Sequence, residues 1–389
     1  MDKEGFEENL KSQNILFFMN ILRDGAGMIN REIGFVGELK KRGYNVSILS
    51  YFRPQKVLDD PSIPVDRVFR TNYHTRLYEN PLFFPLAFIL VFLKFLKFKP
   101  DIVFVDLAHE NRWANIFRPI FSYKVISTYH GVAESRFYSG ETARQLDLFR
   151  DLSYKHLRKS DHIIVVSDFL LEETNKLGLH ARRLHNGVDA KRCNPGRRVD
   201  GLRADKPLIT FIGRYTEYKG AMNVVRAFKI VQEAIPEAQL LMHGFMESGG
   251  YIDEIKGFLE DHSLKDNVYM FGPLDGAEMP YRMNASNLFI NGSLYETFCM
   301  PLLEAQACGV ACVAFAEGGI PEVVLDKKTG LLAKGESIEE YAQHIITLLR
   351  DPDLRRSYAK NALEHALTFT YDKLTDQLLT ILHEEMELK

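Results

Sequence analysis

The stretch NLFINGSLYETFCMPLLEAQACG, residues 287–309, contains a strand, a loop and a helix in the order that decides the fold class. Its first six residues are mostly apolar and are typical of a buried strand. Pro301 suits the first position of a helix and Gly309 the position just past its end, which predicts a short helix over 301–308. A buried strand followed by a helix is the repeating unit of parallel α/β sheets.

The same alternation continues along the chain in both directions. Short apolar runs separated by longer helical patterns indicate parallel βαβ units. We expect strands at 14–20, 45–51, 102–105, 124–128 and 162–166 in the first half, and at 207–213, 238–244, 267–272, 287–292, 310–315 and 330–333 in the second half.

A polar segment rich in Gly and Pro, residues 194–206, separates these two series of strands and predicts a linker. We therefore expect an α/β protein with two Rossmann-like domains, 1–193 and 207–368. Domains of this kind face each other across a cleft, with strand C-termini and helix N-termini directed towards it.

The composition excludes several classes of protein. The 389 residues are enough for about two domains. Lys and Arg total 49 against 52 Asp and Glu, so no global basic field favours a nucleic-acid partner. The four cysteines form no C-x-x-C pair, which argues against a zinc site and fits a reducing cytoplasm. The polar N-terminus has no signal-peptide pattern, and we expect a cytoplasmic protein.

The most apolar segment, residues 82–98, allows two interpretations. It is shorter than the roughly 20 apolar residues that a spanning helix needs. It suits a crossover helix packed on a parallel sheet, because a strand follows at once. It also suits a helix lying in the interface on the inner face of the membrane, with Lys94, Lys97 and Lys99 near anionic head groups, although the crossover helix is the favoured interpretation. Peripheral membrane contact therefore stays open.

Two glutamates accompany the predicted helix 301–308. Its free amides and the positive end of its dipole would form an anion site. Glu304, which we place in the first helical turn, can accept hydrogen bonds from a ribose, and Glu296 in the preceding loop can reach the hydroxyls of a donor sugar. Two glutamates at this spacing are also common on protein surfaces, but the flanking Pro301 and Gly309 favour the functional interpretation.

A basic pair follows the first strand of the second series, in GRYTEYKG, residues 213–220. Arg214 comes at the end of the strand and Lys219 where the next helix begins. A lysine near a helix N-terminus is unfavourable against the dipole, and a bound diphosphate would remove that conflict. Arginine can hold phosphate with a fork of donors, while lysine acts as a point charge.

Three residues of the first half are weaker candidates. Gly25 and Gly27 lie between the first strand and its helix, where they permit a ligand to approach the backbone closely. No complete G-x-G-x-x-G is present, so nicotinamide binding is not supported. His130 follows a strand, which would let it hydrogen bond a sugar or phosphate, although a single histidine is more often structural.

Taken together, these stretches resemble the GT-B glycosyltransferases of family 4, which include sucrose-phosphate synthases and phosphatidylinositol mannosyltransferases. The resemblance covers nearly the whole chain and is densest from 163 to 330. It is carried by HIIVVSDFL (162–170), HNGVD (185–189), GRYTEYKG, the Glu296/Glu304 pair and GGIPEVV (318–324). The segment 369–389 is similar to the final helix of the family, which crosses back to the N-terminal domain.

The resemblance implies a role for each candidate residue. Arg214 and Lys219 would neutralise the leaving diphosphate, and Glu304 would hold the ribose. The remaining contacts to the donor sugar would come from Glu296, the amides of Thr297, Phe298, Cys299 and Met300, His130, and the backbone at Gly25 and Gly27. The implied reaction retains the anomeric configuration through an oxocarbenium-like transition state. The implied leaving group is stabilised by cations and a helix dipole, with no metal ion or other cofactor.

Two departures leave the donor sugar open. Thr297 and Cys299 stand where the family often has glycines, and Ala311 stands where it usually has proline. A UDP-sugar is the commonest donor of similar enzymes and GDP-mannose the next, and the acceptor is expected to be a glycan, a lipid-linked molecule or a small molecule. The alternatives are a nucleotide-sugar epimerase, a non-catalytic partner subunit and a membrane-docking module of the same fold.

Overall fold

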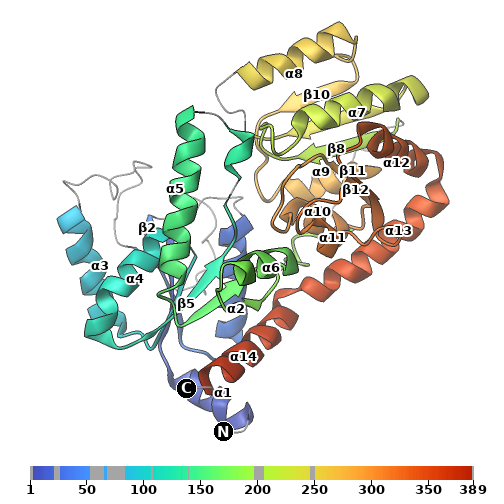
Figure 1. The fold of residues 1–389 in the computed structure, drawn as a ribbon. Helices are drawn as coiled ribbons and strands as arrows, with labels where there is room; N and C mark the ends of the chain where they lie inside the picture. The colour runs from blue at the N-terminus through green and yellow to red at the C-terminus, as the bar shows by residue number, and fades with distance from the viewer. Residues whose placement is uncertain are drawn as a thin grey trace. The chain divides into compact units, whose positions relative to one another are not determined.

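The computed structural model (Figure 1) describes residues 3–21, 27–52, 65–67, 84–106, 108–132, 134–138, 140–196, 206–245 and 250–387. The chain divides into two compact units, which we describe one at a time. Unit 1 comprises Met1–Gly187 and Tyr371–Lys389, and unit 2 comprises Val188–Thr370. Residues 188–193, which we expected in the first domain, therefore belong to unit 2.

Unit 1 contains a sheet of seven described strands, all paired in parallel. In spatial order these are β3 (Val65–Arg67), β2 (Val46–Phe52), β1 (Ile15–Ile21), β4 (Ile102–Val105), β5 (Lys124–Tyr129), β6 (His162–Val165) and β7 (Arg182–Arg183). Its helices are α1 (Lys3–Ser12), α2 (Gly27–Lys41), α3 (Phe84–Phe98), α4 (Ala108–Phe121), α5 (Gly140–Leu157), α6 (Asp168–Lys176) and α14 (Tyr371–Glu387), with a 3₁₀ turn η2 (Ser135–Phe137).

Unit 2 contains a parallel sheet of six described strands. In spatial order these are β10 (Val268–Phe271), β9 (Gln239–His243), β8 (Leu208–Ile212), β11 (Leu288–Asn291), β12 (Cys312–Phe315) and β13 (Gly330–Ala333). Its helices are α7 (Ala221–Ala234), α8 (Gly250–Asp261), α9 (Met279–Ala285), α10 (Met300–Ala307), α11 (Ile320–Val323), α12 (Ile338–Arg350) and α13 (Pro352–Ala366), with a 3₁₀ turn η3 (Leu367–Phe369).

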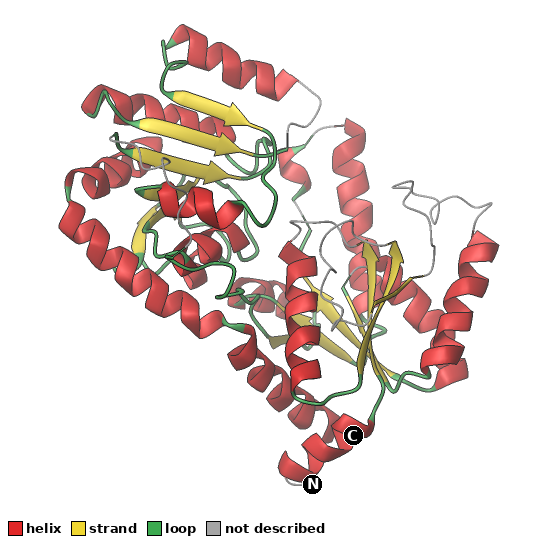
Figure 2. Cartoon of the chain, turned by 180° about the vertical axis from the view of Figure 1, so that it is seen from behind, coloured by secondary structure: helices red, strands yellow, loops and turns green. Residues whose placement is uncertain are grey.

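Both sheets have the doubly wound order, in which the direction of strand addition reverses once. The reversal lies between β1 and β4 in unit 1, and between β8 and β11 in unit 2. Helices cover both faces of each sheet (Figure 2). Strands sandwiched in this way are buried on both faces, which explains why β4 and β12 read as unbroken apolar runs and why β11 is apolar up to Asn291. Ligands of such sheets bind at the carboxyl ends of the strands beside the reversal.

The C-terminal helix returns to the first unit, as the sequence predicts. Leu374, Leu378 and Leu382 recur every four residues along α14 and are buried in one core with Phe35 and Leu39 of α2. Each such side chain contributes roughly 1.5–3 kcal/mol on full burial. An ion pair of 2.5 Å between Arg42 and Asp376 adds to this contact.

The apolar segment forms α3, and only one of its faces is buried. Ala87, Val91 and Phe95 lie in a core with Trp113 and Phe117 of α4. The opposite face carries four exposed apolar side chains, which are Leu86, Ile89, Leu93 and Leu96. We name these four residues the α3 stripe. Among the described helices, none is both long and apolar enough to cross a bilayer.

Candidate functional site

The basic pair and Glu296 come together at the strand reversal of unit 2, and Glu304 lies on α10, the helix that follows the same loop. The loop after β8 carries Arg214 and Lys219, and the loop after β11 carries Glu296. Because β8 and β11 are adjacent in the sheet, these loops emerge side by side at its carboxyl edge. Lys219 and Glu296 lie 77 positions apart in the chain, and the parallel topology brings their side chains into contact.

Glycine allows the two loops to touch. Gly220 has a φ of +66°, and a Cβ there would overlap the carbonyl oxygen of Gly292 in the other loop. With this approach in place, Lys219 Nζ donates to Glu296 Oε1 over 2.7 Å. The Ser293 hydroxyl donates to the same oxygen over 3.0 Å. Glu296 is therefore buried and held, with its charge balanced by Lys219.

Tyr218 lies between Arg214 and Lys219 in the sequence, and its aromatic ring contacts both cations. The Arg214 guanidinium is 5.4 Å from the centroid of the Tyr218 ring, and Lys219 Nζ is 5.1 Å from it. The guanidinium also donates to the Tyr218 hydroxyl. Cations over a ring face are stabilised by its quadrupole, so the buried Tyr218 orients both charges at the site. Tyr218 belongs to the GRYTEYKG motif, but the sequence alone indicated no role for its side chain.

The helix start that we predicted as an anion site is present. Helix α10 begins at Met300, with Pro301 in its first turn and Cys299 as an N-cap in the left-handed conformation, φ 75°. No side chain caps it. Among the described residues, no acceptor is found for the amides of Thr297, Cys299 and Met300. Amides and dipole at such an end favour an anion.

The loop before α10 is fixed by a second backbone contact. The Gly319 amide donates to the Glu296 carbonyl over 2.8 Å, and a Cβ on Gly318 would overlap that carbonyl. Phe298 is buried, with its ring 6.0 Å from that of Phe369. The GGIPEVV motif thus has a structural role in holding the residues that lead into α10.

Glu304 differs from our expectation in two respects. It lies in the second turn, because α10 begins at Met300 and one turn takes 3.6 residues. It is also 3% exposed and forms an ion pair with Arg192. Burial raises the pKa of the Glu304 carboxyl, and Arg192 opposes this shift only in part. Arg192, which donates over 2.9 Å to the Gly276 carbonyl as well, is a site residue that sequence reasoning missed.

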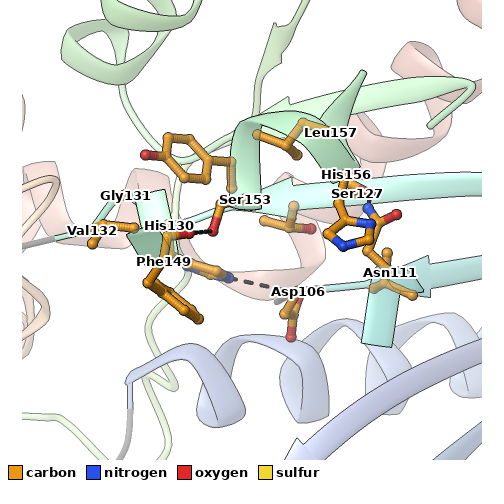
Figure 3. Close-up of a pocket in the computed structure, with 13 residues that line it drawn as sticks. Asp106, Asn111, Ser127, His130, Gly131, Val132, Phe149, Ser153, His156 and Leu157 are labelled. Atoms are coloured by element: carbon orange, nitrogen blue, oxygen red, sulfur yellow. Dashed lines mark hydrogen bonds and ion pairs between the residues drawn. The ribbon is translucent and has the colours of Figure 1, made fainter. Parts of the chain in front are cut away.

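His130 lies in unit 1, at the carboxyl end of β5. It lines a pocket with Asp106, Thr128, Ser153 and His156 (Figure 3). Its side chain is 8% exposed, with Nε2 3.7 Å from Asp106 Oδ1. Burial lowers the pKa of His130 to about 3, helped by Arg31 and opposed by Glu32, so the imidazole is neutral at neutral pH.

Two further acids of unit 1 accompany this histidine. Ligand atoms of Glu32, Asp106 and His130 all lie within 4.8 Å of one another, which is a spacing that can hold a metal ion. Arg31, however, is also buried and is ion paired with Glu32. A divalent cation there would be repelled by this guanidinium, so the group fits a proton better than a metal.

The glycines predicted to line the first unit's side of the site are only partly described. Gly25 lies outside the described residues. Gly27 is the first residue of α2, which follows β1 at the strand reversal of unit 1. A glycine at a helix start beside the reversal permits close approach of a ligand to the backbone.

Comparisons with known proteins match both units. Residues 196–365 match the family described as glycosyl transferases group 1, and residues 33–192 match glycosyltransferase family 4. The D-inositol 3-phosphate glycosyltransferase of Actinosynnema mirum is 34% identical over 204 residues, which cover 50% of this chain and 49% of that protein. The match thus spans about half the length of this curated relative.

Solved structures share the fold over almost the whole chain. Sucrose-phosphate synthase from Thermosynechococcus elongatus has a TM-score of 0.78 at 21% identity, covering 97% of this chain and 100% of that one. An Anabaena protein solved in complex with UDP and glucose has a TM-score of 0.75 at 19% identity, covering 95% and 99%. The two family matches together cover most of the chain, and we conclude that this protein belongs to the family 4 glycosyltransferases of the GT-B fold.

Proposed function

We propose that this protein is a retaining, metal-independent hexosyltransferase that uses a nucleotide diphosphate sugar, with a UDP-sugar favoured and GDP-mannose next. The observation that carries the proposal is the cationic pair Arg214 and Lys219 beside the uncapped start of α10. The solved Anabaena relative binds UDP and glucose, which supports a UDP donor. The two proteins share the fold at only 19% identity, so the identity of the nucleotide base in the donor is part of the proposal.

In this mechanism the two cations and the α10 amides receive the diphosphate as its bond to the sugar breaks. Charge develops on the leaving oxygen in an oxocarbenium-like transition state, and fixed donors stabilise it most strongly there. Lys219 is held at the site by Glu296, which also offers its second oxygen to the donor sugar. Glu304, positioned by Arg192, accepts from the ribose.

The existing balance of charges at the two glutamates supports metal independence. Glu296 is paired with Lys219 and Glu304 with Arg192. A metal ion at either buried carboxylate would have to displace the partly exposed cation that already pairs with it, whereas a diphosphate adds negative charge beside positive groups. We therefore propose that the protein supplies the neutralising charge.

We also propose that the enzyme is cytoplasmic and contacts the inner face of the membrane through α3. The α3 stripe places Leu86, Ile89, Leu93 and Leu96 on one exposed face, and Lys94 and Lys97 lie on the same helix. An apolar face with lysines nearby suits the boundary of an anionic bilayer. Such contact would bring a lipid-linked acceptor close to the enzyme.

The membrane proposal is tested by vesicle sedimentation at low salt. Wild type is expected to bind vesicles containing anionic lipid, and Leu93→Glu to bind them several-fold more weakly. Leu177→Glu, at an exposed leucine of unit 1 outside the α3 stripe, is the matched control and should bind as wild type. Equal binding by all three proteins, or none by wild type, contradicts the proposal.

The function itself is tested by a donor screen in EDTA. Thermal shift is measured with UDP-, GDP-, ADP- and dTDP-sugars for wild type, Lys219→Ala and the control Lys229→Ala. Lys229 lies on α7 in the same unit and pairs only with Glu233 among the described acids. One donor should stabilise wild type and Lys229→Ala but not Lys219→Ala. A shift in none of the proteins with any donor favours a non-catalytic partner subunit.

A further inference from the structure

A buried group of ionisable side chains lies behind His130 in unit 1. Arg31 and Glu32 come from α2, Asp106 follows β4, and Thr128 and His130 come from the end of β5. Arg31 and Glu32 are 2% and 1% exposed. The Asp106 carboxyl lies within hydrogen-bonding reach of Glu32 and Thr128. Three elements thus bring two carboxyl groups and an imidazole together away from water.

The charges of this group do not balance if both acids are ionised. Arg31 supplies one positive charge and is ion paired with Glu32. The second carboxylate then has no cation among the described neighbours, because His130 is neutral. Glu32 Oε2, Asp106 Oδ1 and His130 Nε2 also have no hydrogen-bond partner in the described part of the chain. Like charges in contact and out of water retain a proton.

The direction of the pKa shifts agrees with this geometry. Burial and then Asp106 raise the pKa of Glu32 to about 7, although Arg31 opposes the shift. Burial raises the pKa of Asp106 to about 6. Each carboxyl is therefore protonated more readily when the other is ionised, and the two titrate together.

We propose that Glu32 and Asp106 share one proton, and that this protonated pair holds the imidazole of His130 neutral and in one orientation. Glu32 and Asp106 are then positioning residues, and His130 is the group that meets the substrate. The consequence for turnover rests on the proposed function, whereas the shared proton does not.

Other titratable groups near the pocket do not supply the missing charge. On the α5 side, His156 lines the same pocket and is buried. Burial lowers the pKa of His156, and Lys159, Arg112 and Lys155 lower it further, so it is neutral at neutral pH. Among the described residues, Arg31 from α2 is therefore the charged group that faces the pair, and the histidines at the end of β5 and on α5 are neutral.

Thermal unfolding against pH tests the shared proton without any activity. A carboxyl whose pKa is raised on folding stabilises the protein fully below its unfolded pKa, and this contribution is lost as pH rises through its folded pKa. For Glu32 the window runs from about 4.5 to about 7. Glu32→Gln mimics the protonated acid, so its melting temperature should match wild type at pH 5 and exceed it by several degrees at pH 8.

Glu38→Gln is the matched control, with the same substitution on the same helix. Burial alone would raise the pKa of Glu38, but hydrogen bonds from Lys41 and Arg42 outweigh it and lower the pKa. Its contribution is therefore present at high pH, and Glu38→Gln should be no more stable than wild type at pH 8. If the melting curve of Glu32→Gln runs parallel to wild type across pH 5–8, the shared proton is refuted.

Measurements of enzyme activity against pH independently test whether Glu32 and Asp106 position His130. The kcat of wild type should fall as pH rises above about 7, and Glu32→Gln should remove this fall while leaving the KM for the donor unchanged. Asp106→Ala should lower kcat, and Asp106→Asn should restore part of it. Kinetic profiles that are identical in all variants overturn the positioning role. Loss of wild-type activity on every donor contradicts the proposed function only, because the melting curves still report the proton.

The same melting experiment also tests whether Glu32, Asp106 and His130 bind a metal ion in place of the shared proton. If the melting temperature of wild type falls in EDTA and rises again with Mg²⁺ or Zn²⁺, and Glu32→Gln abolishes that response, then the group holds a cation and the shared proton is wrong.

Discussion

The site at the strand reversal of unit 1 and the site at the strand reversal of unit 2 balance their buried charges in different ways. In unit 2 the two site glutamates each have a cation, with Lys219 beside Glu296 and Arg192 beside Glu304. In unit 1 two carboxyl groups, those of Glu32 and Asp106, share Arg31 as the one cation among their described neighbours. A site with paired charges and an uncapped helix end can accept an added anion, whereas a site with one cation too few holds a proton instead. The difference suits one site to a diphosphate and the other to a neutral sugar.

Removing one member of a pair in unit 2 should have the largest effect. Arg192→Ala leaves Glu304 buried without a cation, and breaking a buried pair costs about 3–5 kcal/mol. Chemical denaturation should show this loss at pH 8. The double variant Arg192→Ala/Glu304→Gln should recover part of it, because no unpaired charge remains. Equal stability of the single variant and wild type would mean that the pair is not buried in solution.

Removing the cation that faces the donor should mainly affect turnover. Lys219→Ala is expected to lower kcat by about 10²–10³, as loss of a fixed donor to a developing oxyanion does. Initial rates with saturating donor measure this, with Lys229→Ala as a control that should match wild type. An unchanged rate for Lys219→Ala would overturn the assignment of the leaving-group site.

Separating the two loops of unit 2 should have a smaller effect on stability. Gly220→Ala forces a side chain into a left-handed backbone position, which costs about 1–3 kcal/mol, and moves the Gly292 carbonyl. Denaturation and donor binding should both weaken. Gly250→Ala is the control, because a Cβ at the start of α8 meets no described atom within 4 Å. Equal behaviour of both variants would show that the loop contact is not needed.

Much of the fold could be predicted because buried parallel strands are locally distinct. Each strand expected from an apolar run is present, with ends that differ by at most two residues. Helix α10 was predictable from Pro301 and Gly309, which mark its two ends. Helix α1 was missed, because its polar sequence shows few apolar residues, although Phe6 and Leu10 are buried in the core.

The candidate site was less predictable because its partners are far apart in the chain. Arg192 lies 112 positions from Glu304, just before a segment that reads as a linker. Arg31, Glu32 and Asp106 lie on or beside elements whose register the sequence does not fix, so no local pattern connects them with His130. Family motifs indicated the residues that we propose to contact the donor, whereas their buried partners Arg192, Arg31, Glu32 and Asp106 required the structure.

The central claim is that protein groups, and no metal ion, hold the donor diphosphate in unit 2. Calorimetric titration of UDP and GDP into wild type and Lys219→Ala, in EDTA and then in Mg²⁺, tests it most directly. We predict that wild type binds one of the two nucleotides equally well in both buffers. Lys219→Ala should bind it at least about tenfold more weakly, which corresponds to about 1.4 kcal/mol. Binding that requires Mg²⁺, or equal affinity of wild type and Lys219→Ala, would contradict the claim.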